Sequence, residues 1–431
     1  MKSLGLILPG LLFPLLARAQ APAAPPPAPR PTGPHLSLEA AIAHAEQIHP
    51  SLAADQASAE AALARIDQVR ASTRPQVNGN ASIGGNLSTP TAADDPHTSL
   101  DVNVKGSWLI TDFGRTTARR KAAEASALAA RDQVAVTGLD VRTDVETAYL
   151  LAIAQRELVD VAVDAETAAN RHLDEAHRFV LAGAKDPIEE ATAAATAAAQ
   201  KAARIRAEGS YQAAIAELRL AVGDPSIPDD VSLDETWPGA LDGEDQARDA
   251  LVANAMAHRP ELMQAQLAIQ AAEESRIAAS YGHRPTVSVG ASVDWSRHDK
   301  DIGDPFWTAG LTLSVPIFDG GLIAAQTREA EANKTEAMAR RAQEALSVRS
   351  DVESAWIDLR SDQAALESSK AAVTAARQQL TLAEGRYTAG VGSPVELADA
   401  QNAVVNAEGQ RVTAEWQLAT ARTRLRRALG Q

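Results

Sequence analysis

The sequence predicts an α+β membrane protein in which long coiled-coil helices are combined with four β-strands, and three observations carry this prediction. Alanine is abundant and aromatic residues make up only 3% of the 431 residues, which suits long, closely packed helices. Four segments of about ten residues alternate regularly between apolar and polar side chains, as membrane-spanning strands do. The order of helices and strands is present twice, so the chain contains an internal duplication.

Charge and cysteine content exclude several classes of function. The chain has 41 basic and 56 acidic residues, a formal net charge of −15, which argues against binding to nucleic acid through phosphate contacts. The absence of cysteine removes disulfides, thiolate metal sites, cysteine nucleophiles and the lipidated cysteine of lipoproteins. No uncharged apolar run long enough for a transmembrane helix follows the N-terminal segment.

The N-terminus has the pattern of a secretory signal. A basic start is followed by the apolar run Leu4–Leu16 and by Ala17-Arg18-Ala19, which fits an A-x-A cleavage site. We therefore expect residues 1–19 to be a signal peptide and the Pro/Ala-rich residues 20–35 to be an extended tether. A buried N-terminal helix is the alternative, and the two prolines within the apolar run argue against it. The protein is expected to be exported, in a bacterium, and not to be lipidated.

Two parts of the chain match each other at a nearly constant spacing. Arg74-Pro75 recurs as Arg284-Pro285, 210 residues later, and Val141–Tyr149 matches Val348–Trp356 at a spacing of 207. The change of three residues falls within 82–110, and an insertion is best tolerated in an exposed loop. Convergent alanine-rich helices would not keep one spacing over so long a stretch, so we interpret the match as a duplication.

The repeats define the expected organisation of the mature chain. A first repeat covers residues 36–223, an equatorial linker 224–246 and a second repeat 247–430. Each repeat starts with a helix and continues with a β-hairpin, a long helix and a returning helix. In the first repeat the last three elements are expected at 77–110, 115–182 and 188–222. In the second repeat they are expected at 287–317, 322–389 and 394–429.

The four alternating segments have the length and pattern of strands that cross a bilayer. In the first of them Val77 and Ile83 share one face, while asparagine and serine occupy the other. A tilted strand needs about ten residues to span the membrane, and apolar-outside, polar-inside alternation is typical of membrane β-barrels. Trp108, Trp295 and Trp307 lie near strand ends, where aromatic girdles meet the membrane surfaces. A soluble sheet with one wetted face is the alternative.

A helix of unusual length is expected after each hairpin. Residues 115–182 contain no proline, and a helix over this range would be roughly 100 Å long. Val141 and Val145 belong to a series spaced by three and four residues, which predicts a coiled-coil seam. The two shorter helices of the repeat nearly match this length when placed end to end. Residues 37–49 and the linker 224–246 would then form a belt at their junction.

Closure of the predicted sheet requires several copies of the chain. Four strands cannot close a barrel, and an open sheet edge is not viable in lipid. Two copies would give eight strands with a filled interior, and three copies would give twelve strands with a lumen. A tube of helices needs many helices side by side, which also favours three copies.

The ordered set of residues resembles the TolC-type outer membrane efflux and secretion proteins, over residues 36–430. The motifs that carry the resemblance are His49-Pro50-Ser51-Leu52 and Arg259-Pro260-Glu261-Leu262, Arg74-Pro75 and Arg284-Pro285, Asp112-Phe113-Gly114 and Asp319-Gly320-Gly321, and Arg178-Phe179-Val180-Leu181-Ala182-Gly183 and Arg386-Tyr387-Thr388-Ala389-Gly390. The resemblance implies a homotrimer with a 12-stranded β-barrel in the outer membrane and a long periplasmic α-barrel.

The resemblance also implies a function and a set of partners. The protein would be the passive exit duct of a tripartite efflux pump or of a type I secretion system. Its partners would be a periplasmic adaptor (membrane fusion) protein, an inner-membrane transporter and outer membrane lipid. No cofactor is implied, because the energy for transport would come from the partners.

Four residues near the far ends of the helical hairpins receive roles from the resemblance. Glu396 and Asp399 correspond to acidic rings that would constrict the pore and select cations. Tyr387 and Glu189 correspond to partners in links between hairpins that hold this end shut, although Gly392 stands where one subgroup has an arginine. Helix capping is the alternative role for both glutamates, since each follows a capping residue and a proline. A solvated helix face is the alternative for Asp399.

The turns between the helices are assigned by the resemblance to contact with the helical hairpin of the adaptor. Small residues there would permit close approach of another helix. The expected docking residues are Leu181, Ala182, Gly183, Ala184, Thr388, Ala389, Gly390 and Val391. An ordinary interhelical turn is the alternative.

No catalytic, cofactor-binding or metal-binding residues are expected. Asp112-Phe113-Gly114 imitates a kinase triplet without the accompanying loops, and its aspartate is expected to cap the long helix. Asp299, Asp301 and Asp304 have incomplete spacing for a calcium loop. The alternative to a duct is a secreted coiled-coil scaffold of the envelope without a pore, which has no need of four bilayer-length strands.

Overall fold

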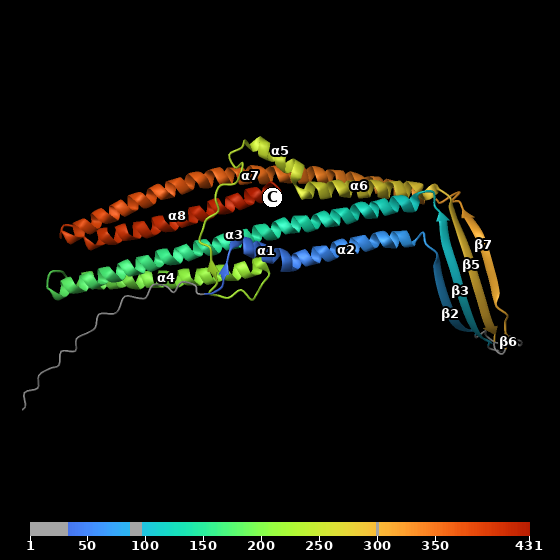
Figure 1. Ribbon diagram of the computed structural model, residues 1–431, viewed down its shortest axis with the longest axis horizontal. Coiled ribbons are helices and arrows are strands. Elements are labelled where there is room, and N and C mark those ends of the chain that lie inside the picture. The colour runs from blue at the N-terminus through green and yellow to red at the C-terminus, as the bar shows by residue number, and fades with distance from the viewer. Residues whose placement is uncertain (1–32, 87–96, 299–300) are drawn as a thin grey trace, which may run out of the picture.

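The structure, a computed structural model, describes residues 33–86, 97–298 and 301–431 (Figure 1). The expected signal peptide at 1–19, nearly all of the expected tether, residues 87–96 of the expected loop and Asp299 lie outside the described residues. The described chain is elongated, with helices running side by side over most of its length and strands gathered at one end (Figure 1).

Two helices of 67 residues each set the length of the molecule, α3 (Arg115–Leu181) and α7 (Leu322–Thr388). The returning helices α4 (Pro187–Val222) and α8 (Pro394–Ala428) fold back along them (Figure 1). α3 also packs against α8, so the two helical hairpins lie side by side. No helix in the described ranges is both long and apolar enough to cross a membrane.

Two shorter helices complete the helical layer next to the strands. α2 (Pro50–Ala71) packs against α3, and α6 (Pro260–Ser280) packs between α3 and α7. A 3-10 turn, η1 (Tyr281–His283), follows α6 directly. The lateral order of helices in this half is therefore α2, α3, α6 and α7.

The remaining elements gather around the middle of the molecule (Figure 1). They are α1 (Leu38–Ile48), α5 (Arg248–His258) and the short parallel pair β1 (His35–Leu36) and β4 (Ser232–Leu233). β4 belongs to the linker, so this pair joins the start of the first repeat to the segment between the repeats. α1 and β4 come from the two segments expected to form a belt, 37–49 and 224–246, and α5 follows the second of them in the chain.

Local signals start the two long helices. The carboxylate of Asp112 accepts hydrogen bonds from the N–H groups of Gly114 (3.2 Å) and Thr116 (2.7 Å), which confirms its predicted capping role. Asp319 accepts one from Gly321 (2.9 Å) at the start of α7. Gly114 and Gly321 adopt φ angles of 100° and 89°, a conformation that favours glycine.

The strands form one antiparallel sheet in the order β2, β3, β5 and β7. Their bounds are β2 (Gln76–Asn86), β3 (His97–Thr111), β5 (Thr286–His298) and β7 (Phe306–Ser314), with the short β6 (Asp301–Ile302) pairing with the end of β5. β3 pairs directly with β5, so the sheet joins the two repeats. Within the described ranges, β2 and β7 each have one unpaired edge.

β7 is shorter than the sequence predicts. We expected the second hairpin to extend to residue 317, but β7 ends at Ser314. Pro316 has no N–H group to donate to a neighbouring strand, so alternation of apolar residues continues past the point where pairing stops.

The register of the sheet places the apolar side chains of all four strands on one face. Val104 lies opposite Val293, and the side chain of Leu311, on the next strand, is 70% exposed. On the other face the amide of Asn103 donates a hydrogen bond to the carboxylate of Asp294. The described chain leaves the apolar face uncovered.

Each apolar core belongs to a single repeat. The main core of the first repeat includes Val145 and Leu218, and that of the second includes the matching Val352 and Leu425. All four side chains are fully buried. None of the cores among the described residues combines side chains from both repeats, although α3 packs directly against α6 and α8 of the second repeat.

Candidate functional site

The ends of the two helical hairpins lie opposite the sheet and form tight turns (Figure 1). Gly183 and Gly390 adopt φ angles of 67° and 72° there, which suits glycine after a helix end. The return helices are capped by the side chains of Asp186, bonded to the N–H of Ile188 (3.0 Å), and of Ser393. Proline follows each cap at the first helical position, so both turns are closed by local geometry.

The structure places every predicted docking residue on the surface of these turns. They are Leu181, Ala182, Gly183, Ala184, Thr388, Ala389, Gly390 and Val391. Leu181 and Val391 are the large apolar side chains among them, and both are exposed. The two turns therefore offer small and apolar surface to a partner, and their role in docking stays a prediction.

Tyr387 and Glu189, the predicted gate-stabilising residues, lie together across the two hairpins. The hydroxyl of Tyr387 donates to the carboxylate of Glu189 over 3.4 Å, a long hydrogen bond. The ammonium of Lys185 lies 2.8 Å from the same carboxylate and 3.5 Å from the centroid of the Tyr387 ring. Burial acts to lower the pKa of Lys185, but its hydrogen bonds to Glu189 and Tyr387 produce a net rise.

A histidine that the sequence did not single out completes this cluster. The ring of His172 on α3 meets the Tyr387 ring edge-on, with 5.2 Å between the centroids. The side chain is buried and its Nδ1 atom has no hydrogen-bond partner. Burial lowers the pKa of His172, with a smaller opposing contribution from Glu175. The contact joins residues far apart in the chain, so no local sequence pattern predicts it.

The two predicted constriction residues differ in their surroundings. The carboxylate of Glu396 lies 3.1 Å from the guanidinium of Arg386, so its charge is partly neutralised within the chain. Asp399 is exposed one helical turn further along α8 and has no ion pair within the described ranges. Neither Glu189 nor Glu396 supplies the cap oxygen of its helix, which comes from Asp186 and Ser393. The pore-facing role of Glu396 and Asp399 stays a prediction.

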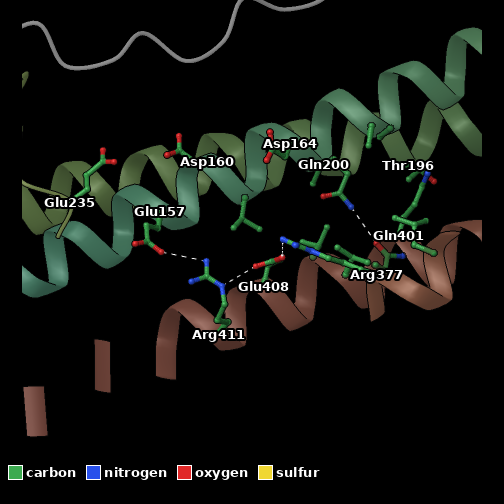
Figure 2. A pocket seen from close by; sticks show the side chains of 18 residues that line it. Glu157, Asp160, Asp164, Thr196, Gln200, Glu235, Arg377, Gln401, Glu408 and Arg411 are labelled. Atoms are coloured by element: carbon green, nitrogen blue, oxygen red, sulfur yellow. Dashed lines mark hydrogen bonds and ion pairs between the residues drawn. The ribbon is translucent and has the colours of Figure 1, made fainter. Parts of the chain in front are cut away.

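A polar groove separates the two hairpins midway along the helices (Figure 2). Its cavity of about 630 Å³ is lined by Glu157, Asp160 and Asp164 of α3 and by Glu408 and Arg411 of α8, among others. Arg411 bridges the groove, with 3.5 Å to Glu157 and 3.0 Å to Glu408. Burial raises the pKa of Glu157, while hydrogen bonds from Trp237 and Arg411 oppose the rise. The sequence analysis missed this groove because its residues come from four helices and the linker.

The groove is part of a polar boundary between the repeats. Further along it the amide of Gln200 donates to Asn402 (3.3 Å), and near the tips Arg171 lies 3.9 Å from Glu384. Polar interfaces within a chain resemble transient contacts and permit relative motion, whereas each hairpin has an apolar core. Polar contacts therefore join the two hairpins along this stretch.

The described residues contain no cluster of three or more histidine, aspartate or glutamate side chains that is arranged to hold a metal ion. Asp112 of the kinase-like triplet is occupied as a helix cap by hydrogen bonds from Gly114, Thr116 N and Thr116 Oγ1. The chemistry available at the tips and the groove is that of charged and apolar surfaces.

Comparison with known proteins gives a consistent family and fold. A family described as outer membrane efflux proteins matches residues 41–224 and 251–431. Outer membrane protein TolC of Vibrio cholerae is 23% identical over 300 residues, which are 67% of this chain and 66%, just under two thirds, of that relative.

Two solved structures share the fold at low identity. A membrane protein from Pseudomonas aeruginosa superposes with a TM-score of 0.77 at 22% identity, covering 91% of this chain and 90% of that one. The Campylobacter jejuni CmeC outer membrane channel superposes with a TM-score of 0.76 at 16% identity, covering 91% and 85%.

Proposed function

The chain belongs to the outer membrane efflux protein family, and we propose that it is the trimeric outer membrane duct of a tripartite efflux pump or type I secretion system. Solutes would pass through it without energy input, from the periplasm to the exterior. The observation that carries this proposal is the four-stranded sheet, which has one uncovered apolar face and two unpaired edges.

The sheet has the properties of one segment of a membrane barrel. Its apolar face suits contact with lipid, and its polar face, which carries Asn103 and Asp294, suits a water-filled lumen. The unpaired edges of β2 and β7 would cost several kcal/mol per backbone group in lipid unless another copy paired with them. Three copies, with β7 of each copy paired to β2 of the next, would give twelve strands and an open lumen.

The helices have their free edges on the same sides as the strands. α2 and α4 flank α3 on the side of β2, whereas α7 lies at the other edge, on the side of β7. Ile205 on α4 and Met338 on α7 are exposed on these edge helices. A head-to-tail ring would therefore close the strands and the helices in one step, giving a β-barrel continuous with an α-barrel.

We assign the gate of the duct to the helical tips. Asp399, with Glu396 one turn before it, would form acidic rings around the threefold axis and would favour cations. The contact of Tyr387 with Glu189 would hold the two hairpins together in the closed state. The polar boundary between the repeats supports this assignment, because it permits the hairpins to separate.

The partners proposed for the tips are a periplasmic adaptor and, through it, an inner-membrane transporter that supplies energy and selects the substrate. Support comes from the exposed turns, where Leu181 and Val391 flank glycine and alanine. Apolar tips with little side-chain bulk allow another helical hairpin to approach closely.

Native mass spectrometry of the detergent-solubilised full chain tests the assembly. The expected result is a species of three copies that inserts into lipid bilayers when the detergent is removed. A folded monomer that stays in solution without detergent would contradict the proposal and would favour the envelope scaffold.

A further inference from the structure

A basic pocket lies where the first hairpin meets the helices. Its volume is about 460 Å³, and it is lined by the end of α2, the end of β3 and the first turns of α3. Three arginines contribute to its wall, Arg70 and Arg74 from the α2 end and Arg120 from α3. Asp112 is the single carboxylate among the lining residues, so the wall carries an excess of positive charge.

The positive charges of this pocket are available to a ligand. Arg74 makes no ion pair within the described ranges. Arg120 lies 3.8 Å from Glu124, and Arg70 is shared between Asp67 (3.2 Å) and the same Glu124 (3.8 Å), all partly exposed pairs that contribute little. The carboxylate of Asp112 is already occupied by the hydrogen bonds that cap α3.

One wall of the pocket is apolar and continues into the sheet. Leu109 and Ile110 line it, at the point where the register of β3 against β5 shifts, and Ile110 is exposed. The indole N–H of Trp108 donates a hydrogen bond to the carbonyl of Thr73 (3.0 Å), the residue that precedes Arg74. Tryptophan next to basic side chains is typical of the boundary between hydrocarbon and headgroups.

The second repeat has the same order of elements but lacks two of the three arginines of this pocket. The positions that match Arg70 and Arg120 are Ser280 and Thr327. The match of Arg74 is Arg284, which donates to the carbonyl of Phe113 and stacks 3.2 Å from the Tyr281 ring centroid. If these arginines served only to join strands to helices, both repeats would need them. All three are present in the first repeat alone.

We propose that the pocket binds the phosphate group of an anionic phospholipid in the membrane leaflet that borders the helices. Guanidinium groups form paired hydrogen bonds with phosphate oxygens, and three arginines line this pocket. An acyl chain would then lie along Ile110 and the apolar face of the sheet. The inference rests on the proposed membrane placement of the sheet.

Native mass spectrometry of the detergent-solubilised full chain, titrated with dioleoyl phosphatidylglycerol, tests the proposal. We expect Arg74→Gln combined with Arg120→Gln to weaken binding roughly tenfold, since charge-assisted contacts are lost. The matched control is Arg248→Gln with Arg340→Gln, which removes the same charge at exposed pairs with Asp249 and Glu336. The control should bind the lipid as the wild type does.

Two further titrations separate the sources of phosphate. Dioleoyl phosphatidylcholine should bind more weakly than phosphatidylglycerol, because its choline neutralises the headgroup. Inorganic phosphate bound as tightly as phosphatidylglycerol would overturn the assignment to a lipid.

Equal loss of lipid in the pocket variant and the control would overturn the site itself. If the glutamine variant does not fold, Arg74→Lys with Arg120→Lys keeps the charge and should weaken binding less, because lysine lacks the planar fork. Unchanged binding in the lysine variant would then contradict the proposal that planar guanidinium groups hold the phosphate. The same spectra report the number of chains, so an error in the proposed assembly is seen separately from an empty pocket.

Discussion

α3 and α7 have the same length of 67 residues and come from matching parts of the two repeats, yet they differ in burial. Leu150 on α3 is 1% exposed, whereas Ile357, 207 residues later on α7, is 56% exposed. α3 packs against α2, α4, α6 and α8, while α7 lies at the edge of the layer. Matching sequences therefore occupy the centre and the edge of one layer.

Large apolar side chains are exposed along the edge helices. Leu346 and Leu382 are exposed along α7, and Leu63 on α2 and Leu220 on α4 are exposed at the opposite edge. Copies placed side by side would cover both edges at once. α3 has its neighbours within the chain, whereas we expect α7 to find them in the next copy.

The largest effect is expected from a charge placed at the two matching positions. Leu150→Asp buries an unpaired carboxylate and should lower the free energy of unfolding by about 4 kcal/mol or more. Ile357→Asp should preserve the fold, because its side chain is exposed, but should prevent assembly. Urea unfolding followed by circular dichroism and native mass spectrometry measure the two effects. Trimers of Ile357→Asp with wild-type stability would contradict the assignment of α7 to an interface.

A second matched pair compares buried and exposed charge. Glu146 on α3 is buried and binds Arg426 (2.7 Å) and Thr423 (3.0 Å), whereas the matching Glu353 on α7 is paired with Arg349 at 3.8 Å on its own helix. Glu146→Gln should lower the free energy of unfolding by about 3 kcal/mol, and Glu353→Gln by less than about 1 kcal/mol. Similar losses in the two variants, measured by urea unfolding, would mean that α3 and α7 are equally buried in the assembly.

A smaller effect is expected at the tips, where the hairpins touch through polar atoms. Tyr387→Phe removes the hydroxyl that donates to Glu189, a contact of about 1 kcal/mol, and should raise the open probability of the channel about fivefold. Tyr211→Phe, within the core of the first hairpin, is the control and should leave gating unchanged. Single-channel recording compares them, and equal open probability in all three proteins would remove Tyr387 from the gate.

The smallest effect is expected on the loss of stability when the pH is lowered. The pKa of His172 is lowered below its ordinary value of 6.5, first by burial, so the unfolded chain binds a proton more readily than the folded chain. Stability contributed by the neutral ring is therefore present above pH 6.5 and is lost as the pH falls from there toward the lowered pKa. The melting temperature should fall less on acidification in His172→Gln than in the wild type. An identical fall in both would show that His172 does not contribute to the acid response.

The long helices could be predicted because their signals are local. Proline-free, alanine-rich sequence, the caps at Asp112 and Asp319 and the glycines at the far turns act within a few residues of the chain. The expected helix at 115–182 therefore corresponds to α3 within one residue. The end of β7 was placed too late because the alternation of side chains persists beyond Pro316, where backbone pairing cannot.

The features that could not be predicted depend on the side-by-side order of the helices. The sequence shows two matching long helices but does not state which of them is central, and that order decides the burial of Leu150 and Ile357. The groove around Arg411 and the contact of His172 with Tyr387 join segments of different repeats for the same reason. The resemblance to the family assigned Tyr387 and Glu189 to the tips, and their contact depends on the packing of the two hairpins.

Single-channel conductance of the purified protein in planar lipid bilayers, with Asp399→Ala alongside, is the decisive test of the proposed duct. A trimeric duct gated by acidic tips should give small, cation-selective currents that increase and become less selective in the variant. Well-folded protein that neither inserts nor carries current would contradict the account, and the uncovered apolar face of the sheet would then need another explanation.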